Sequence, residues 1–123
     1  MMIRQMKHGE EDKIRELIAK LSYEDQTLWR KRIKPMEECL TESSRIPVSA
    51  EIKGKNVILV AEEDGTIVGL CWCTIVDRGV DKQAEIVEFY IEREYRGRGI
   101  GKELITAAKQ LFINEQVEVA FVW

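Results

Sequence analysis

Residues 85–102 of the 123-residue chain read EIVEFYIEREYRGRGIGK and carry the clearest indication of its fold. This stretch begins with an apolar strand pattern, passes through a charged turn and ends in RGRGIGK, residues 96–102, before an amphipathic helix. Three glycines at alternate positions let backbone N–H groups converge on a ligand without obstruction by side chains. The helix start adds unpaired N–H donors and a partial positive charge, and two arginines and a lysine add full charges. The segment therefore predicts a pyrophosphate site.

Two common phosphate-binding motifs do not fit this segment. A dinucleotide-binding G-x-G-x-x-G would need glycine in place of Lys102. A P-loop would need glycine in place of Arg96 and Ser or Thr in place of Glu103. The pattern that fits is [QR]-x-x-G-x-[GA], with Arg96, Gly99 and Gly101 at its fixed positions. It resembles the acetyl-coenzyme A signature of the GNAT superfamily of N-acetyltransferases. The plainer alternative is a glycine-rich turn that caps a helix, with solvated arginines.

The spacing of apolar residues before this segment predicts helices after one short strand. We expect the strand over residues 2–6 and an amphipathic helix that runs to about Leu21. Ser22 resembles an N-cap and predicts a second helix, which ends or kinks near Pro35. A further helical turn is expected over residues 36–40.

The pattern then changes to that of strands. They are expected at residues 57–61, 67–76 and 85–91, with Asp64-Gly65 as a hairpin signal between the first two. A helix follows the glycine-rich segment, and a last strand is expected at residues 117–123. Because that helix crosses over between them, the last two strands should run parallel.

The resulting order, β-α-α-β-β-β-α-β, is similar to most of the GNAT fold. The resemblance implies an α/β protein with a mixed, mostly antiparallel sheet flanked by helices, in a single N-acetyltransferase-like domain over residues 1–123. The usual C-terminal helix and hairpin have no counterpart, so we assign no general acid, a role that a Tyr of that helix often has in the family. The resemblance also implies that the last two strands splay apart near residues 89–91, where the pantetheine arm enters.

Composition argues against several other classes of protein. Nineteen Lys and Arg against 22 Asp and Glu give a net charge of −3, a poor match to a nucleic-acid-binding protein. No stretch approaches the roughly 18 apolar residues of a membrane span, and the charged N-terminus has no apolar signal-peptide core. We therefore expect a cytoplasmic protein in which Cys39, Cys71 and Cys73 are reduced thiols. Cys71 and Cys73 should share one strand face as small hydrophobes, and we expect no metal site.

The resemblance implies roles for backbone groups on both sides of the turn, with acetyl-CoA as the acyl donor. The Phe89 N–H would face the thioester carbonyl, and the Ile91 backbone would pair with the pantetheine arm. The N–H groups of residues 97–102 would bind the pyrophosphate, with Arg96 or Arg98 supplying charge. A bulky side chain at Gly99 or Gly101 would then occupy the phosphate position. The implied donor-binding residues are Phe89, Tyr90, Ile91, Arg96, Gly97, Arg98, Gly99, Ile100, Gly101 and Lys102.

Acetyl transfer to an amine also needs a base, because a free alkylamine with a pKa near ~10 is protonated at neutral pH. Glu85 and Glu88 are the candidate catalytic residues, and their odd separation predicts opposite faces of the strand. Glu85 matches the position of the base in histone-type family members, and we favour it. Glu88 lies beside the thioester-facing residue and is the alternative, as the base or as a contact for a cationic substrate. Both can equally be surface carboxylates.

The expected reaction is transfer of acetyl to a primary amine of a small molecule or peptide. The alternative is an acyl-CoA-binding or assembly module that lacks catalysis. Glu37, Glu38 and Glu51 mildly favour a cationic acceptor. The apolar edge of the last strand predicts a homodimer, and no nucleic-acid or membrane partner is expected. We expect Trp72 to pack in the core and His8 to be exposed.

Overall fold

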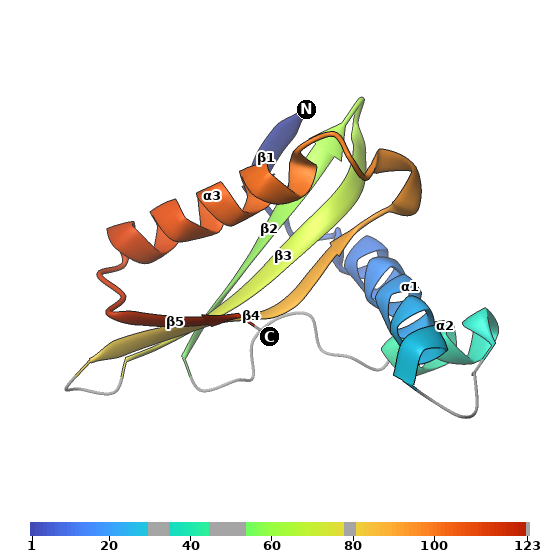
Figure 1. Cartoon of the computed structure of the whole chain (residues 1–123), viewed down its shortest axis with the longest axis horizontal. Helices are drawn as coiled ribbons and strands as arrows, with labels where there is room; N and C mark the ends of the chain where they lie inside the picture. Colours follow the sequence, from blue (N-terminus) through green and yellow to red (C-terminus); the bar gives the residue numbers. More distant parts are fainter. Residues whose placement is uncertain (30–34, 45–53, 78–80, 123) are drawn as a thin grey trace. The chain divides into compact units, whose positions relative to one another are not determined.

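Five strands form one sheet in the order β1-β2-β3-β4-β5 in the computed structural model (Figure 1). The structure describes residues 1–29, 35–44, 54–77 and 81–122. It divides into two compact units, one formed by Met1–Met6 with Ser49–Trp123 and the other by Lys7–Val48. The sheet belongs to the first unit. Its strands are β1 Met2–Gln5, β2 Lys55–Glu63, β3 Thr66–Asp77, β4 Lys82–Ile91 and β5 Val119–Val122.

The pairing of the strands confirms the mixed, mostly antiparallel sheet. The first three pairs of neighbours are antiparallel. The β2–β3 hairpin turns at Asp64 and Gly65, whose φ angles of 49° and 79° suit a tight two-residue turn. The pair β4–β5 is parallel, from Gln83 opposite Val119 to Ile86 opposite Val122. This is the predicted crossover, made by helix α3, Ile100–Asn114.

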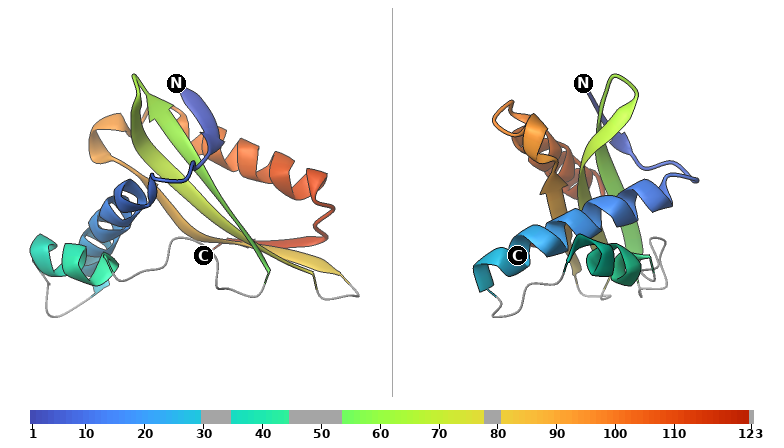
Figure 2. Two further views of the ribbon diagram at one scale, coloured as in Figure 1. Left: turned by 180° about the vertical axis from the view of Figure 1, so that it is seen from behind. Right: turned by 90° about the vertical axis from the view of Figure 1, so that its right-hand side faces the viewer.

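Helix α3 lies along one face of the sheet (Figures 1 and 2). Its buried side chains recur at every fourth position and pack on apolar side chains of β2, β3 and β4. Cys71 and Cys73 lie in this core, fully buried, with their sulfur atoms 3.8 Å apart. Their burial makes both residues core hydrophobes, as predicted, and the hydrogen bond to Cys71 together with burial raises the pKa of the Cys73 thiol. The buried α3 residues are Ile100, Leu104, Ala108 and Phe112.

In the second unit, one helix occupies the stretch in which the sequence predicts a first helix and the start of a second. Helix α1 spans Glu11–Trp29 without interruption, so the predicted break at Ser22 is wrong. No Gly or Pro occurs between its ends, and apolar residues continue at helical spacing. A serine inside a helix costs only a few tenths of a kcal/mol, about the range of ordinary helix propensities, so it did not end the helix. Residues 30–34, the last part of the expected second helix before Pro35, lie outside the described residues.

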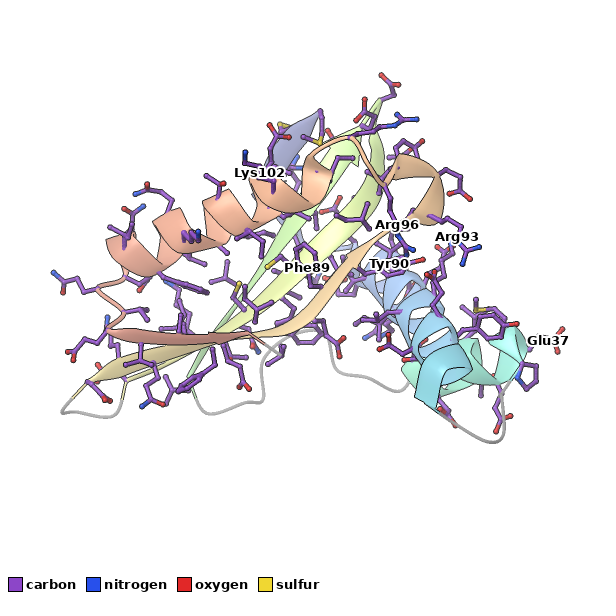
Figure 3. The ribbon with its side chains drawn as sticks, in the orientation of Figure 1. Glu37, Phe89, Tyr90, Arg93, Arg96 and Lys102 are labelled. Carbon is purple, nitrogen blue, oxygen red and sulfur yellow. The ribbon has the colours of Figure 1, made fainter. Side chains whose placement is uncertain are left out.

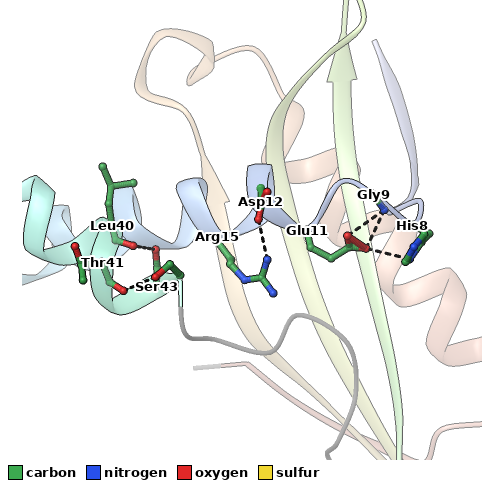
Figure 4. Close-up of polar contacts among 9 residues, drawn as sticks. His8, Gly9, Glu11, Asp12, Arg15, Leu40, Thr41 and Ser43 are labelled. Atoms are coloured by element: carbon green, nitrogen blue, oxygen red, sulfur yellow. Dashed lines mark hydrogen bonds and ion pairs between the residues drawn. The ribbon is translucent and has the colours of Figure 1, made fainter.

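Helix α2, Met36–Ser43, starts directly after Pro35 and is longer than the predicted turn. At the other end of this unit, both carboxylate oxygens of Glu11 accept the Gly9 N–H at 3.0 Å (Figure 4). This backbone hydrogen bond is the main cause that lowers the pKa of Glu11. His8 lies beside it with a fully exposed side chain, as predicted. None of the helices in the described part of the chain has the length and apolar content to cross a membrane.

Candidate active site

A β-bulge in β4 sets the orientation of the two candidate carboxylates. Glu88 pairs with Trp72 of β3, but the next pair is Cys73 with Ile86, so Val87 is the extra residue. Glu85 then pairs with Thr74. Thr74 and Trp72 are two residues apart and share one face of β3, so Glu85 and Glu88 lie on the same face of β4. The prediction of opposite faces is wrong, because alternation along a strand holds only where no bulge interrupts it.

That face is the one opposite α3, because Cys71 and Cys73, which pack under α3, alternate with Trp72 and Thr74. Thr74 is buried and both glutamates are half-buried. Trp72 is buried, as predicted, and its indole Nε1–H donates to Asn56 Oδ1 at 3.0 Å. The carboxylates therefore lie beside a fixed indole and a buried hydroxyl. The sequence did not reveal this group, since no local signal links Asn56 to Trp72.

Among the described residues, β5 pairs with β4 only as far as Ile86. The C-terminal half of β4 therefore has one edge without a strand partner there. On its other edge, the Glu92 N–H donates to the Val68 carbonyl of β3 at 2.8 Å. Backbone groups of successive residues in a strand point to opposite edges, so Phe89 and Ile91 direct theirs away from β3. The position of the Arg96 side chain agrees, since its Nε–H donates to the Ile91 carbonyl at 2.8 Å. The predicted splaying near residues 89–91 lies beyond the paired residues and stays a prediction.

The glycine-rich segment follows β4 through a short 3₁₀ turn, η1, Arg93–Tyr95. Gly97 and Gly99 have φ angles of 79° and 82°, in the left-handed region that favours glycine. Gly99 is the N-cap of α3, and no side chain caps this helix. Within the described part of the chain, no hydrogen bond is donated by the backbone N–H groups of residues 97–102. These donors, at a positive helix end, fit the predicted pyrophosphate site.

The three glycines of the segment have two different functions in the structure. A Cβ atom on Gly97 or Gly99 would meet nothing within 4 Å, so the space on that side is open to a ligand. A Cβ atom on Gly101 would lie 3.1 Å from Ile91 Cδ1 and 3.4 Å from Phe89 Cζ. The expectation that a side chain at Gly101 would occupy the phosphate position is therefore wrong. Gly101 instead allows the first turn of α3 to approach β4.

The segment also carries cationic side chains: Arg96 lies beside Tyr90 of β4, and Lys102 lies on α3 (Figure 3). The guanidinium of Arg96 lies over the Tyr90 ring, 5.3 Å from its centroid, and that of Arg98 lies 5.0 Å from the centroid of Tyr95. Lys102 is exposed in the first turn of α3. Tyr90 itself is buried and connects to the segment through Arg96. Among the described residues, no group of three or more His, Cys, Asp or Glu could hold a metal ion.

Glu37 and Glu38, expected to favour a cationic acceptor, form the first turn of α2 in the other unit. Glu51 lies outside the described residues.

Comparison with known proteins agrees with this geometry. The model of the acetyltransferase (GNAT) family matches residues 15–123. An uncharacterized N-acetyltransferase of Archaeoglobus fulgidus is 34% identical over 76 residues, which make up 58% of this chain and 50% of that protein. The match thus spans half the length of that relative.

Solved structures share the fold. An acetyltransferase from Vibrio fischeri superposes with a TM-score of 0.74 at 24% identity, over 100% of this chain and 97% of that chain. An aminoglycoside acetyltransferase from an uncultured soil metagenomic sample, in complex with sisomicin, gives a TM-score of 0.66 at 21% identity, over 99% and 76% of the two chains. With its fold, its glycine-rich helix start and a family match over most of its length, the chain belongs to the GNAT family of acetyltransferases.

Proposed function

We propose that this protein transfers the acetyl group of acetyl-CoA to a primary amine of a small molecule or peptide. The observation that carries the proposal is the continuity of two sets of backbone donors. The groups of Phe89 and Ile91 face the edge of β4 that has no strand partner among the described residues. A few residues later, the N–H groups of residues 97–102 lie at the start of α3 and donate no hydrogen bond within the described residues. An extended pantetheine arm that ends in a pyrophosphate is complementary to this arrangement.

The Phe89 N–H supplies electrostatic stabilisation in this proposal. It would donate to the thioester oxygen, where negative charge develops as the amine attacks. Loss of one such donor typically costs ~3 kcal/mol of transition-state stabilisation. The pairing at Ile91 would use its N–H, since its carbonyl already accepts from Arg96.

The base in this proposal is Glu88 rather than Glu85. Both lie on one face of β4, but Glu85 lies in the half of β4 that pairs with β5, opposite Phe121. Glu88 lies beyond the bulge and directly precedes Phe89. The Glu88 carboxylate first takes one proton from the ammonium group of the acceptor. The neutral nitrogen then forms a bond to the acetyl carbon and loses its second proton to solvent. The C–S bond breaks, and the CoA sulfur leaves as a thiolate that takes a proton from solvent.

The acceptor in this proposal is cationic before it reacts, because an ammonium group is attracted to two carboxylates on one face. An aminoglycoside acetyltransferase with the same fold was solved in complex with sisomicin, which supports a small, amine-rich acceptor. A homodimer through β5 belongs to the same proposal, since Val119 and Phe121 are 42% and 46% exposed at this edge of the sheet.

Two measurements test the proposal. Calorimetry should show binding of CoA in the micromolar to millimolar range. Thiol release from acetyl-CoA should rise above the hydrolysis background when a panel of aminoglycosides, polyamines and peptides is added. Binding without amine-dependent release would instead identify an acyl-CoA-binding module, and absence of binding would contradict both interpretations.

A further inference from the structure

Arg96 connects the turn η1 with the end of β4. It is the first fixed residue of the glycine-rich segment, and its backbone closes η1 through a hydrogen bond from its N–H to the Arg93 carbonyl at 3.2 Å. Its Nε–H donates to the carbonyl of Ile91 at the end of β4. Its guanidinium lies over the ring of Tyr90, whose side chain is on the opposite face of β4 from that of Ile91. Arg96 therefore reaches around the end of the strand.

The contacts of Arg98 differ from those of Arg96. Its guanidinium also lies over a tyrosine, but this is Tyr95 in the turn itself, so the contact does not reach the sheet. Both arginines are exposed and carry the same charge. In the described part of the chain, Arg96 donates a hydrogen bond to the strand that would hold the pantetheine arm and Arg98 does not. The planar group of Arg96 has the geometry for a directed N–H bond and ring stacking at once.

We propose that Arg96 is a positioning residue, which fixes the end of β4 relative to the start of α3, and that it is not a ligand of the pyrophosphate. This inference rests on the proposed function, since it concerns the distance between the thioester-facing N–H of Phe89 and the donors of residues 97–102. Arg98 and Lys102, which form no hydrogen bond or ion pair with β4 among the described residues, remain to supply the positive charge.

The two possible roles predict opposite effects of one substitution. Arg96→Gln removes the charge but keeps an N–H that can donate to the Ile91 carbonyl, whereas Arg96→Ala removes both. If Arg96 is a positioning residue, the Gln variant should keep kcat/KM for acetyl-CoA within about threefold of the wild type, and the Ala variant should lose about tenfold, as expected for a lost charge-assisted hydrogen bond. If Arg96 binds phosphate, both variants should fall equally, and the proposal is overturned.

A truncated acyl donor distinguishes a positioning role of Arg96 from a contribution of its charge in a second experiment. Acetyl-pantetheine has the arm and the thioester but not the nucleotide and its pyrophosphate. Arg96→Ala should lower kcat with acetyl-pantetheine and with acetyl-CoA by the same factor, because the thioester is misplaced in both. Arg98→Gln is the matched control, which should raise KM for acetyl-CoA only. A loss in Arg96→Ala that is confined to acetyl-CoA would contradict the positioning role.

The contact itself can be tested without any donor. In ¹⁵N NMR spectra, the Arg96 Nε–H should give a slowly exchanging signal, and Tyr90→Leu should speed its exchange. The Nε–H of Arg98 is the internal reference and should exchange faster. A rapidly exchanging Arg96 signal would overturn the proposal. If the signal is protected but the wild type binds no CoA, the proposed function fails and the positioning role fails with it, while the structural contact stands.

Discussion

Glu88 lies directly across the β3–β4 ladder from Trp72, on the face of the sheet opposite α3. The bulge at Val87 creates this pairing, because without it Glu88 would direct its side chain toward α3 and the apolar core. One extra residue in β4 thus places a carboxylate beside a buried indole and next to the backbone of Phe89. The first expected outcomes concern this residue.

Glu88→Gln should lower kcat by about 100-fold, the lower end of the usual contribution of a general base. The amide has the same shape but cannot take the proton of the amine. Binding of CoA should be unchanged, because the proposed donor contacts are made by the backbone. Steady-state kinetics and calorimetry check the two parts. Glu85→Gln is the control and should change kcat by less than about tenfold; the reverse order of effects would make Glu85 the base.

Gly101→Val should lower the free energy of unfolding by about 1–3 kcal/mol, the usual cost of overpacking. Its Cβ atom alone would lie 3.1 Å from Ile91 Cδ1, and the valine methyl groups would push α3 away from β4. Urea denaturation measures the change. Substitution of Lys102, which is exposed in the same turn, is the control and should change stability by less than about 0.5 kcal/mol. Equal stability of Gly101→Val and wild type would contradict the close approach.

Asn56→Ala should destabilise the protein by about 1–3 kcal/mol, because it leaves the buried indole N–H of Trp72 without its acceptor. Trp72→Phe removes the donor as well, and the double variant should be more stable than the sum of the two single effects predicts. A double-mutant cycle of unfolding free energies measures this coupling. Strict additivity would show that the hydrogen bond does not contribute to stability.

Cys71 and Cys73 should resist alkylation in the native protein. Both are fully buried, and the raised pKa of Cys73 keeps its thiol protonated near neutral pH. Iodoacetamide labelling followed by peptide mapping should find these two residues modified only when urea unfolds the sheet. Rapid labelling at zero denaturant would mean that the core opens far more easily than its packing implies.

Phe121→Lys should weaken self-association if two copies meet through β5. Phe121 is 46% exposed at the edge of the sheet, and a lysine there opposes edge-to-edge pairing. Sedimentation velocity at high micromolar concentration should show a dimer for the wild type and a monomer for the variant. A monomeric wild type would remove the proposed interface.

The sequence predicted what depends on local chemistry. The parallel pair β4–β5 followed from the need for a crossover, and the donors at the start of α3 followed from the glycines before Ile100. The same local rules gave wrong predictions where the surrounding residues determine the structure. Ser22 has the composition of a cap, but uninterrupted helical spacing around it kept α1 continuous.

The register of the strands was the other feature that the sequence could not predict. The bulge at Val87 has no glycine to mark it, and it depends on how β4 pairs with β3. The role of Gly101 likewise depends on which strand lies under the helix. The contact of Arg96 with the Ile91 carbonyl joins residues five apart across a turn whose path only the structure reveals.

The edge of β4 at Phe89 and Ile91 offers the donor only main-chain groups, which every residue except proline has. Donor binding at this edge would therefore exclude proline but would not depend on which other side chain stands there. The side chains of Phe89 and Ile91 pack against the core under α3, so apolar replacements of similar size should be tolerated there and charged ones should not. Two solved structures that share this fold are only 21% and 24% identical to this chain, so the fold itself persists when most side chains change.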